Sequence, residues 1–381
     1  MTYTSFSQAL RDVADTLSSK APRMKIALTA LGSELPNSDL MQAASDVLGN
    51  IDPVIIGPEG LEGSIHHHAN TLAQAHQIME RLLANGDIDG AVTLHYNFAL
   101  GTTTATQIHS VASGRRMVLS STTGSSDARR ADALVKNALA GLAVADALGI
   151  SHPTLGILNV DGAPAAERIL QRLALTGFPI NFAASSRADG GALMRGNDLI
   201  RAIPNVMVCD TLTGNLLIKL WSAGLSGGEV ETTGCGYGVG LGPHQHAIVC
   251  IISRASGIAT IAGAMQFCAQ MAQREVIKRW QARWQHAQRV GIEQLLTRNA
   301  VVDDPSSTST LNTQDSVPTP VKTVVDDEIH GIDILQLDQA QRCLWLQGIY
   351  AETGMGCTGP VLMIHHQNRA DALKHLRTFL N

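Results

Sequence analysis

Cys357 is the side chain of this sequence whose surroundings suit a nucleophile best. It lies in T-G-M-G-C-T-G-P (residues 353–360), where small neighbours leave a thiol accessible. Successive backbone N–H groups in such a turn stabilise a thiolate or an oxyanion. The other five cysteines lie in apolar or mixed segments, where cysteine behaves as a small hydrophobic residue. We predict that Cys357 is catalytic and that Gly356 and Thr358 contact the substrate; the alternative is a tight turn with an incidental cysteine.

A second candidate is S-R-A-S-G (residues 253–257), which joins a buried apolar strand to a helix. A helix N-terminus offers unpaired N–H groups and the positive end of the helix dipole. A hydroxyl and a guanidinium beside it make an anion site. Ser253 and Arg254 are therefore predicted to be catalytic, and Ser256 and Gly257 to bind phosphate. The alternative is a serine N-cap with a surface arginine.

A third candidate is D-T-L-T-G-N-L-L-I-K (residues 210–219), in which a strand is followed by a glycine turn. Asn215 is predicted to open a helix, which places Lys219 one turn inside it. Polar groups converging on one turn suit a phosphate or a polar carbonyl, and the alternative is an Asx-type turn with a helix cap. The predicted binding residues here are Asp210, Thr213, Gly214, Asn215 and Lys219.

The glycine-rich loop at residues 234–242, within the segment 227–243, contains G-x-G-x-G-x-G, a pattern that suggests dinucleotide binding. That interpretation fails, because the Rossmann loop follows a strand and opens a helix, whereas this loop precedes a strand. We expect it to admit or cover a ligand, or to be purely structural.

Histidines supply weaker signals. His66–His68 is expected to be a solvated polar loop rather than a metal site, because paired metal-ligand spacing is missing. His244 and His246 flank Gln245 just after the glycine-rich loop, and His95 ends a strand, where it is a candidate general base. The sequence has no H-E-x-x-H, Walker or G-x-S-x-G motif, and no metal site is expected.

The elements that must position these residues alternate between strand and helix, which indicates a doubly wound, mainly parallel sheet. In such sheets ligands bind outside the carboxyl ends of the strands, and several predicted strands end in polar or glycine-rich segments. We therefore expect these ends to converge at one edge. The predicted strands are 24–33, 52–57, 90–96, 115–124, 153–162 and 247–252, and the predicted helices are 6–20, 39–48, 70–85, 131–148, 163–176 and 258–297.

Three units are predicted along the chain. Residues 1–300 form a two-lobed α/β core, with three layers around a mainly parallel sheet. Residues 301–327 are rich in Ser, Thr, Asp and Pro, which makes them a flexible linker. Residues 328–381 form a small α/β segment carrying Cys357. Its predicted elements are strands 332–337, 348–352 and 361–365 and helices 338–347 and 368–380.

Composition excludes several classes of protein. The 381 residues are 45% hydrophobic and 16% charged, which supports a sizeable core and excludes a disordered, coiled-coil or collagen-like chain. The net charge of −5 gives no electrostatic case for nucleic acid or an anionic membrane. No targeting segment or membrane span is recognisable, and the scattered cysteines indicate a cytoplasmic protein with free thiols.

Motifs in this chain resemble those of a known family. D-T-L-T-G-N-L-L-I-K resembles the D-x-x-T-G-N-x-x-x-K signature of phosphate acyltransferases of the PlsX and phosphotransacetylase type, and S-R-A-S-G resembles the S-R-G segment of phosphotransacetylases. Most of the chain is similar to the alpha subunit of component C of glycine/sarcosine/betaine reductase, which is PlsX-like. The further matching stretches are L-T-A-L-G-S-E (28–34), S-T-T-G-S-S (121–126), N-V-D-G (159–162), P-I-N-F-A (179–183), R-A-D-G-G-A-L-M-R-G-N-D (187–198), I-H-G-I-D (329–333) and G-I-Y-A-E-T-G-M-G-C-T-G-P (348–360).

This resemblance implies an isocitrate/isopropylmalate dehydrogenase-like (PlsX-like) α/β fold and acyl transfer to inorganic phosphate, without a cofactor. It implies that Cys357 carries an acyl group that leaves as acyl phosphate. Ser253 and Arg254 would bind and polarise the phosphate or the thioester. The usual partner in this family is a ketosynthase-III-like subunit, and a CoA or carrier-protein thioester is another possible acyl donor.

The sequence therefore predicts a phosphate acyltransferase that works as a homo-oligomer or hetero-oligomer. Phosphate is a competent nucleophile near neutral pH, and positioning of well-oriented groups supplies roughly 7–11 kcal/mol. The alternative from another class is a non-catalytic acyl-binding subunit that docks a ketosynthase-like partner. A decarboxylating dehydrogenase is disfavoured, because the sequence has neither a clustered Asp set nor a nicotinamide loop.

Overall fold

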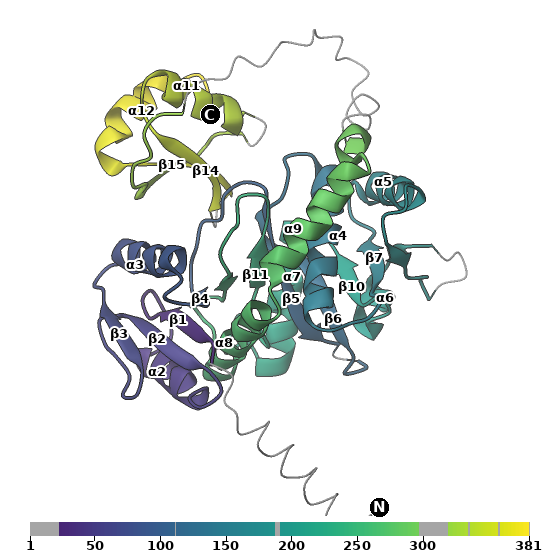
Figure 1. Cartoon of the computed structure of the whole chain (residues 1–381), viewed down its shortest axis with the longest axis horizontal. Coiled ribbons are helices and arrows are strands. Elements are labelled where there is room, and N and C mark those ends of the chain that lie inside the picture. Colours follow the sequence, from purple (N-terminus) through teal and green to yellow (C-terminus); the bar gives the residue numbers. More distant parts are fainter. Residues whose placement is uncertain are drawn as a thin grey trace, which may run out of the picture.

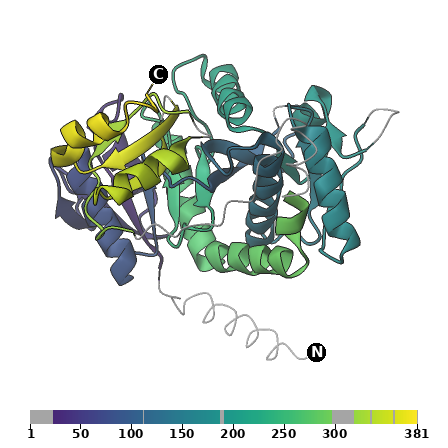
Figure 2. The same cartoon turned by 90° about the horizontal axis from the view of Figure 1, so that it is seen from above.

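The computed structural model describes residues 23–110, 112–186, 191–296, 319–333, 336–356 and 359–380. Its main feature is one 12-stranded sheet with helices on both faces, and a separate 3-stranded sheet belongs to the C-terminal residues (Figures 1 and 2). The predicted mixed α/β fold on a large, mainly parallel sheet is confirmed. The predicted helix at 6–20 and most of the predicted linker lie outside the described residues.

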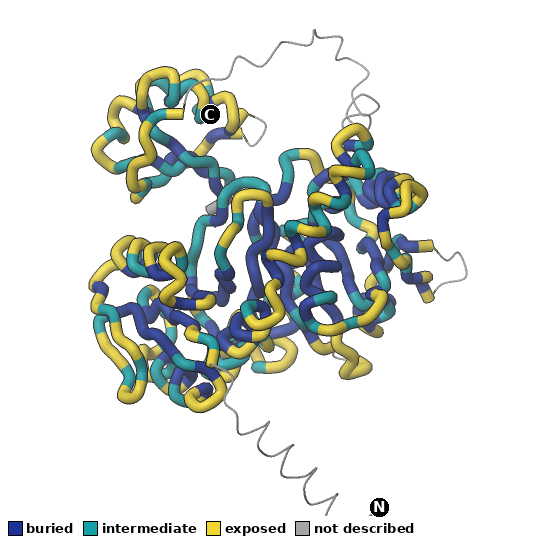
Figure 3. Tube along the Cα trace, viewed as in Figure 1, coloured by how far each residue is buried: buried dark blue, intermediate teal, exposed yellow. Residues whose placement is uncertain are grey.

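The large sheet has the spatial order β3-β2-β1-β4-β12-β11-β5-β6-β10-β7-β8, with β9 paired to β7. Its central strands are apolar and buried, and the tube in Figure 3 is dark blue along them. The strands are β1 (Lys25–Thr29), β2 (Asp52–Gly57), β3 (Ile65–His68), β4 (Gly90–Thr93), β5 (Thr102–His109), β6 (Arg116–Ser125), β7 (Thr154–Leu158), β8 (Asn181–Phe182), β9 (Leu193–Met194), β10 (Val206–Val208), β11 (Gly238–Leu241) and β12 (Val249–Ile251).

The helices of this part carry clear local signals. α3 begins after Thr71, whose side chain accepts a hydrogen bond from the Gln74 backbone N–H, and it ends at Gly86 in the left-handed conformation. The Ala-rich α4 is buried on most sides, because it packs between the sheet, α5 and α9. The helices are α2 (Asn37–Asp46), α3 (Leu72–Asn85), α4 (Arg130–Ala147), α5 (Ala163–Leu175), α6 (Gly196–Arg201), α7 (Thr211–Ser226), α8 (Ile258–Gln273) and α9 (Val276–Arg289).

Strand direction reverses in the middle of the sheet. β12 pairs antiparallel with β11, β11 with β5, and β5 with β6. The parallel group β1, β4 and β12 therefore runs opposite to the parallel group β6, β10 and β7. Our expectation that all the polar strand ends meet at one edge is wrong, because three successive reversals place the ends of β6 and β7 at the other edge.

Part of the glycine-rich segment is a strand, which the sequence did not indicate. β11 inserts between β12 and β5, with Gly238 at φ +85°. A Cβ atom at Gly238 would lie 2.0 Å from the carbonyl oxygen of Ala105. Glycine is required there because both the backbone conformation and the close approach of β5 exclude a side chain.

The C-terminal residues form their own antiparallel sheet, in the order β13-β15-β14, over a core that includes Leu337, Leu344 and Leu362. The predicted strand at 332–337 is wrong: Gly331 turns the chain at φ +87°, and Leu337 already begins a helix. The predicted helix at 368–380 is shorter than expected. The elements are β13 (Asp327–Ile329), α11 (Leu337–Leu346), β14 (Ala351–Gly356), β15 (Gly359–Ile364), η1 (His366–Asn368) and α12 (Arg369–His375).

Two further expectations are settled by the fold. His66–His68 is part of the edge strand β3, which pairs with β2, rather than a loop. The sequence allowed a break in the long helix predicted to reach residue 297, and the structure has one between α8 and α9, where Glu275 adopts φ +52°. None of the helices among the described residues combines the length and apolar character needed to cross a membrane.

Candidate active site

The start of α7 presses closely against β6. Asp210 caps the helix: its Oδ1 accepts from the Thr213 backbone N–H at 3.0 Å, and its Oδ2 accepts from the Thr213 hydroxyl at 2.5 Å. The helix therefore begins at Thr211 and not at Asn215 as predicted. A Cβ atom at Gly214 would lie 1.6 Å from the Ser121 carbonyl oxygen. In this structure Asp210, Thr213 and Gly214 thus serve the capping and packing of α7.

Asn215 and Lys219 lie one turn apart on α7, and both contact the Tyr237 hydroxyl group. Residues at this spacing share a helix face. Burial raises the pKa of Tyr237, so the group is a neutral phenol at physiological pH. Asn215, Lys219 and Tyr237 therefore form a polar cluster between α7 and the start of β11.

Lys219 and Ser253 meet at one carboxylate oxygen. Glu231 Oε2 accepts a hydrogen bond from Lys219 Nζ at 2.6 Å and from Ser253 Oγ at 2.5 Å. These two hydrogen bonds lower the pKa of Glu231, with the Lys219 bond the larger cause. Burial alone would lower the pKa of Lys219, but Glu231 and Tyr237 outweigh it and the pKa is raised. The cluster is therefore an ionised pair with a bound hydroxyl.

Arg254 stands beside the same carboxylate, since its charge contributes to the lowered pKa of Glu231. Its Nε lies 3.3 Å from Oε1 of Glu34, which follows β1, and its carbonyl oxygen accepts from the Glu34 backbone N–H. Ser253 is 7% exposed, whereas the side chain of Arg254 is 58% exposed. The structure thus brings Lys219, Ser253 and Arg254 together from α7 and the end of β12.

Sequence reasoning missed Glu231 and Tyr237. Tyr237 lies in the glycine-rich loop 234–242 that we expected to admit or cover a ligand, but its side chain was not singled out, and Glu231 lies just before that loop. A carboxylate directly before a Thr-Thr-Gly turn carries no local sign of a partner. Glu231 acquires its role only because α7 and the end of β12 come together at this place.

Ser256 and Gly257 occupy structural positions. The Ser256 hydroxyl bonds to that of Thr232, and the two residues are 1% and 0% exposed. Gly257 is the N-cap of α8, and a Cβ atom there would lie 3.1 Å from Val230. These two residues tie the glycine-rich segment to the start of α8 and present little surface to a ligand.

The hairpin of β14 and β15 contacts the core beside β6. Gly354 pairs with Ala99, and the Leu100 backbone N–H donates to the Thr353 carbonyl oxygen at 3.2 Å. Figure 1 shows the hairpin pointing from the C-terminal segment toward the large sheet. Gly356, the last residue of β14, pairs with Gly359, the first of β15. Cys357 and Thr358, which join these strands, lie outside the described residues.

The start of α7 is anchored to the same end of β6. The Gly101 backbone N–H donates to the Ser125 carbonyl oxygen at 2.8 Å, and the Thr211 hydroxyl donates to the Gly124 carbonyl oxygen at 2.7 Å. Next to Gly101, the Thr102 hydroxyl is buried and has no hydrogen-bond partner among the described residues. The hairpin and the first turn of α7 therefore flank one strand end.

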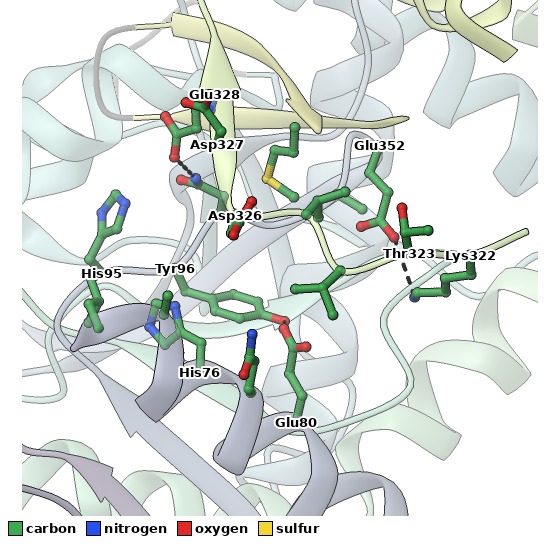
Figure 4. Close-up of a pocket in the computed structure, with 18 of the residues that line it drawn as sticks. His76, Glu80, His95, Tyr96, Lys322, Thr323, Asp326, Asp327, Glu328 and Glu352 are labelled. Atoms are coloured by element: carbon green, nitrogen blue, oxygen red, sulfur yellow. Dashed lines mark hydrogen bonds and ion pairs between the residues drawn. The ribbon is translucent and has the colours of Figure 1, made fainter. Parts of the chain in front are cut away.

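A cavity of about 770 Å³ lies between α3, the segment after β4 and the C-terminal segment (Figure 4). His95, the candidate general base, lines it together with His76, Glu80 and Tyr96. The Tyr96 hydroxyl donates to Glu80 at 3.1 Å, and burial raises the pKa of Glu80. Apart from His95, none of the described residues predicted for phosphate binding or catalysis lines this cavity, and its carboxylates make it unfavourable for anions.

The chain belongs to the fatty acid synthesis protein family, whose family model matches residues 24–363. It is 42% identical over 373 residues to the glycine/sarcosine/betaine reductase complex component C subunit alpha of Peptoclostridium acidaminophilum, a match that covers 96% of this chain and 95% of the relative. The resemblance noted from the motifs is confirmed.

Two solved structures are similar to part of this chain. EutD phosphotransacetylase from Staphylococcus aureus is 14% identical with a TM-score of 0.43, covering 69% of this chain and 98% of that one. A branched-chain phosphotransacylase from Enterococcus faecalis V583 is 16% identical with a TM-score of 0.44, covering 66% and 99%. The family assignment rests on the sequence matches alone.

Proposed function

We propose that this protein transfers an acyl group between a thioester and inorganic phosphate. The observation that supports this most is the meeting of Lys219, Ser253 and Arg254 around the carboxylate of Glu231. Lys219 and Ser253 already hold one anionic oxygen, and the charge of Arg254 acts on the same carboxylate, so together they form a site suited to phosphate. The side chains of Lys219 and Glu231 are 39% and 46% exposed, so the site is open to a small anion.

Cys357 is the residue we propose to carry the acyl group. The position of its flanking strands supports this. Gly354 of β14 pairs with Ala99, and Gly101, two residues further along, bonds to the end of β6. The Thr211 hydroxyl bonds to the same end of β6. The hairpin thus approaches the first turn of α7, two turns from Lys219. Asn215 lies on α7 between these points and contacts Tyr237, which directly precedes β11.

The proposed chemistry is thioester phosphorolysis. An oxygen of hydrogen phosphate attacks the thioester carbonyl carbon and forms a C–O bond. The C–S bond then breaks, and the electron pair leaves with the Cys357 sulfur as a thiolate, which gives a protein thiolate and acyl phosphate. Lys219 and Arg254 balance the phosphate charge, and Ser253 orients one of its oxygens. Inorganic phosphate is a substrate in this scheme, and no cofactor takes part.

We also propose that the protein works as a subunit of a complex. Its relative from Peptoclostridium acidaminophilum is described as subunit alpha of a reductase complex component. A ketosynthase-III-like subunit, a carrier protein or CoA would present the acyl thioester. We further propose that the core has an isocitrate-dehydrogenase-like fold. We also propose that the chain is divided into this core, a linker and a C-terminal segment that carries Cys357.

The test is the intact mass of the purified chain after incubation with short and medium acyl-CoA or acyl-carrier thioesters, with and without phosphate. We expect an acyl adduct that disappears when phosphate is added, while hydroxylamine-reactive acyl phosphate accumulates. Cys357→Ser should lose the adduct. Cys343→Ser is the matched control, because Cys343 is a free cysteine of the same segment that hydrogen-bonds to His375.

Other outcomes would change the proposal in defined ways. Acyl phosphate formed without an adduct, and retained by Cys357→Ser, would mean direct phosphorolysis of the donor thioester. Neither signal, even with a ketosynthase-like partner present, would favour a non-catalytic acyl-binding subunit.

A further inference from the structure

Glu231 is the feature of the candidate site that the proposed reaction does not explain. It is a carboxylate placed where phosphate is proposed to bind, and both of its hydrogen bonds use the same oxygen, Oε2. Its side chain is 46% exposed, so this is not a buried ion pair that the fold needs for its core. Its backbone N–H donates to the Ala255 carbonyl oxygen, which holds the chain in place independently of the carboxylate.

The proton count of Ser253 makes Glu231 and phosphate exclusive partners. A serine hydroxyl has one proton to donate, and in this structure Ser253 donates it to Glu231. Lys219 has three N–H groups and could bridge two acceptors. Ser253 can donate to a phosphate oxygen only after it has let go of Glu231.

Charge leads to the same conclusion. Lys219 faces Glu231, and Arg254 faces Glu34, so the two cations of the site are each offset by a carboxylate. An incoming phosphate dianion would therefore meet a site without net positive charge and a carboxylate at short range. Phosphate gains the full attraction of Lys219 only if Glu231 moves away.

We propose that Glu231 is an exchangeable internal counter-ion of the phosphate site. It holds Ser253 and Lys219 in place in the free protein and is displaced when phosphate binds. A dianion competes for Lys219 more strongly than a singly charged carboxylate does, so this arrangement selects for phosphate over weaker monoanions such as acetate and chloride. The inference rests on the proposed function, because it concerns the same anion site.

The experiment measures orthophosphate binding by isothermal titration calorimetry. Glu231→Gln keeps the shape and removes the charge, so the side chain competes less well for Lys219. We expect the phosphate dissociation constant of Glu231→Gln to fall about tenfold, which corresponds to about 1.4 kcal/mol. Glu229→Gln is the matched control, since Glu229 is an exposed carboxylate two residues earlier in the same loop, and its affinity should equal that of the wild type.

A double-mutant cycle separates the counter-ion role from a merely structural one. The gain in phosphate affinity from Glu231→Gln should shrink when Lys219 is replaced by Met, because the competition is for Lys219. Acetate and chloride should inhibit phosphate binding more in Glu231→Gln than in the wild type. A phosphate affinity of Glu231→Gln equal to or weaker than that of the wild type would overturn the inference.

These results also separate this inference from the proposed reaction. If the wild type forms acyl phosphate but Glu231→Gln binds phosphate no more tightly, only the counter-ion role is wrong. If Glu231→Gln binds phosphate more tightly but no acyl phosphate forms under any condition, the counter-ion role stands and the reaction is wrong. If neither protein binds orthophosphate, both are wrong.

Discussion

Arg254 differs from Lys219 in how firmly it is held. Its ion pair with Glu34 joins two side chains that are 58% and 54% exposed, and such pairs contribute at most about 1 kcal/mol to stability. Lys219 is less exposed and bonds to both Glu231 and Tyr237. Arg254 is therefore free to change partners at little cost, which suits a residue that clamps an incoming anion.

Replacing Arg254 with Ala should raise the KM for phosphate about tenfold, since a hydrogen bond to a charged group is worth about 1.5–3 kcal/mol. The melting temperature should change little, because the pair with Glu34 is exposed. Arg274→Ala, at the exposed C-terminal end of α8, is the control and should leave the KM unchanged. Steady-state kinetics at varied phosphate concentration provide the measurement. An unchanged KM in Arg254→Ala would remove Arg254 from the anion site.

His76 gives the molecule a pH-dependent stability. Burial is the main reason that its pKa falls to about 4, with the charge of His95 adding to the effect. The His76 imidazole binds a proton near pH 6.5 in the unfolded chain but only near pH 4 in the folded protein. Its contribution to the free energy of unfolding is therefore complete above pH 6.5 and is lost as the pH falls toward 4. The total is about 3 kcal/mol at 1.36 kcal/mol per pKa unit.

The free energy of unfolding should therefore fall less steeply between pH 6.5 and 4 in His76→Gln than in the wild type. Urea denaturation at several pH values measures this difference. His68→Gln is the control, because His68 is exposed on the edge strand β3. Parallel pH profiles of His76→Gln and the wild type would contradict the assignment.

At the scale of elements, α7 is the helix that organises the candidate site. Its first turn rests on β6 through Gly214, and its Asn215 and Lys219 point to Tyr237 and Glu231. Close contact between a helix and a strand needs a residue without a side chain at the crossing point. The site therefore depends on one glycine that touches no ligand.

Gly214→Ala should destabilise the protein by about 3 kcal/mol or more, because its Cβ would lie 1.6 Å from the Ser121 carbonyl oxygen and α7 would have to move. Helix propensity predicts the opposite sign, a gain of up to about 1 kcal/mol for Gly→Ala. Gly224→Ala on the same helix measures the effect of helix propensity alone, since a Cβ atom there meets nothing within 4 Å. Thermal or urea unfolding of both variants tests whether packing outweighs propensity. Equal stabilisation of both would disprove the close contact.

At the scale of the whole molecule, the C-terminal segment is a separate small unit that touches the core along the segment after β4. Asn97 donates a side-chain hydrogen bond to Glu328 of β13, and Ala99 pairs with Gly354 of β14. Figure 2 shows the segment lying across the lobe that contains β1 and β2. The proposed reaction needs this docking for phosphorolysis but not for loading of the acyl group.

Asn97→Ala should therefore slow acyl phosphate formation about tenfold or more, because a hydrogen bond to a charged group is worth about 1.5–3 kcal/mol, while acylation of the chain continues. Single-turnover assays that follow adduct formation and adduct loss separate the two steps. Asn50→Ala, in an exposed turn of the core, is the control. Equal slowing of both steps would mean that the contact serves something other than docking.

Much of the fold was predictable, because local patterns determine local structure. The apolar runs that become β1, β2, β4, β6 and β7 and the helices between them were predicted close to their observed bounds. β5 and β11 were not predicted, since β5 is rich in threonine and β11 is half glycine, which gives neither a clear run of apolar residues. Pairing with neighbouring strands makes β11 a strand. The strand at 332–337 was misplaced because Gly331 turns the chain.

Short stretches of chain were enough to predict most of the strand–helix order and the family. They also point to Ser253, Arg254, Asn215 and Lys219 as residues of an anion site, which stays a prediction. The tertiary structure decided that Asp210 caps α7, that the two parallel groups run in opposite directions, and that Glu231 holds Lys219 and Ser253. Glu231 lies 12 and 22 residues from these partners. Contacts over such separations depend on how strands pair and helices pack, which no local pattern encodes.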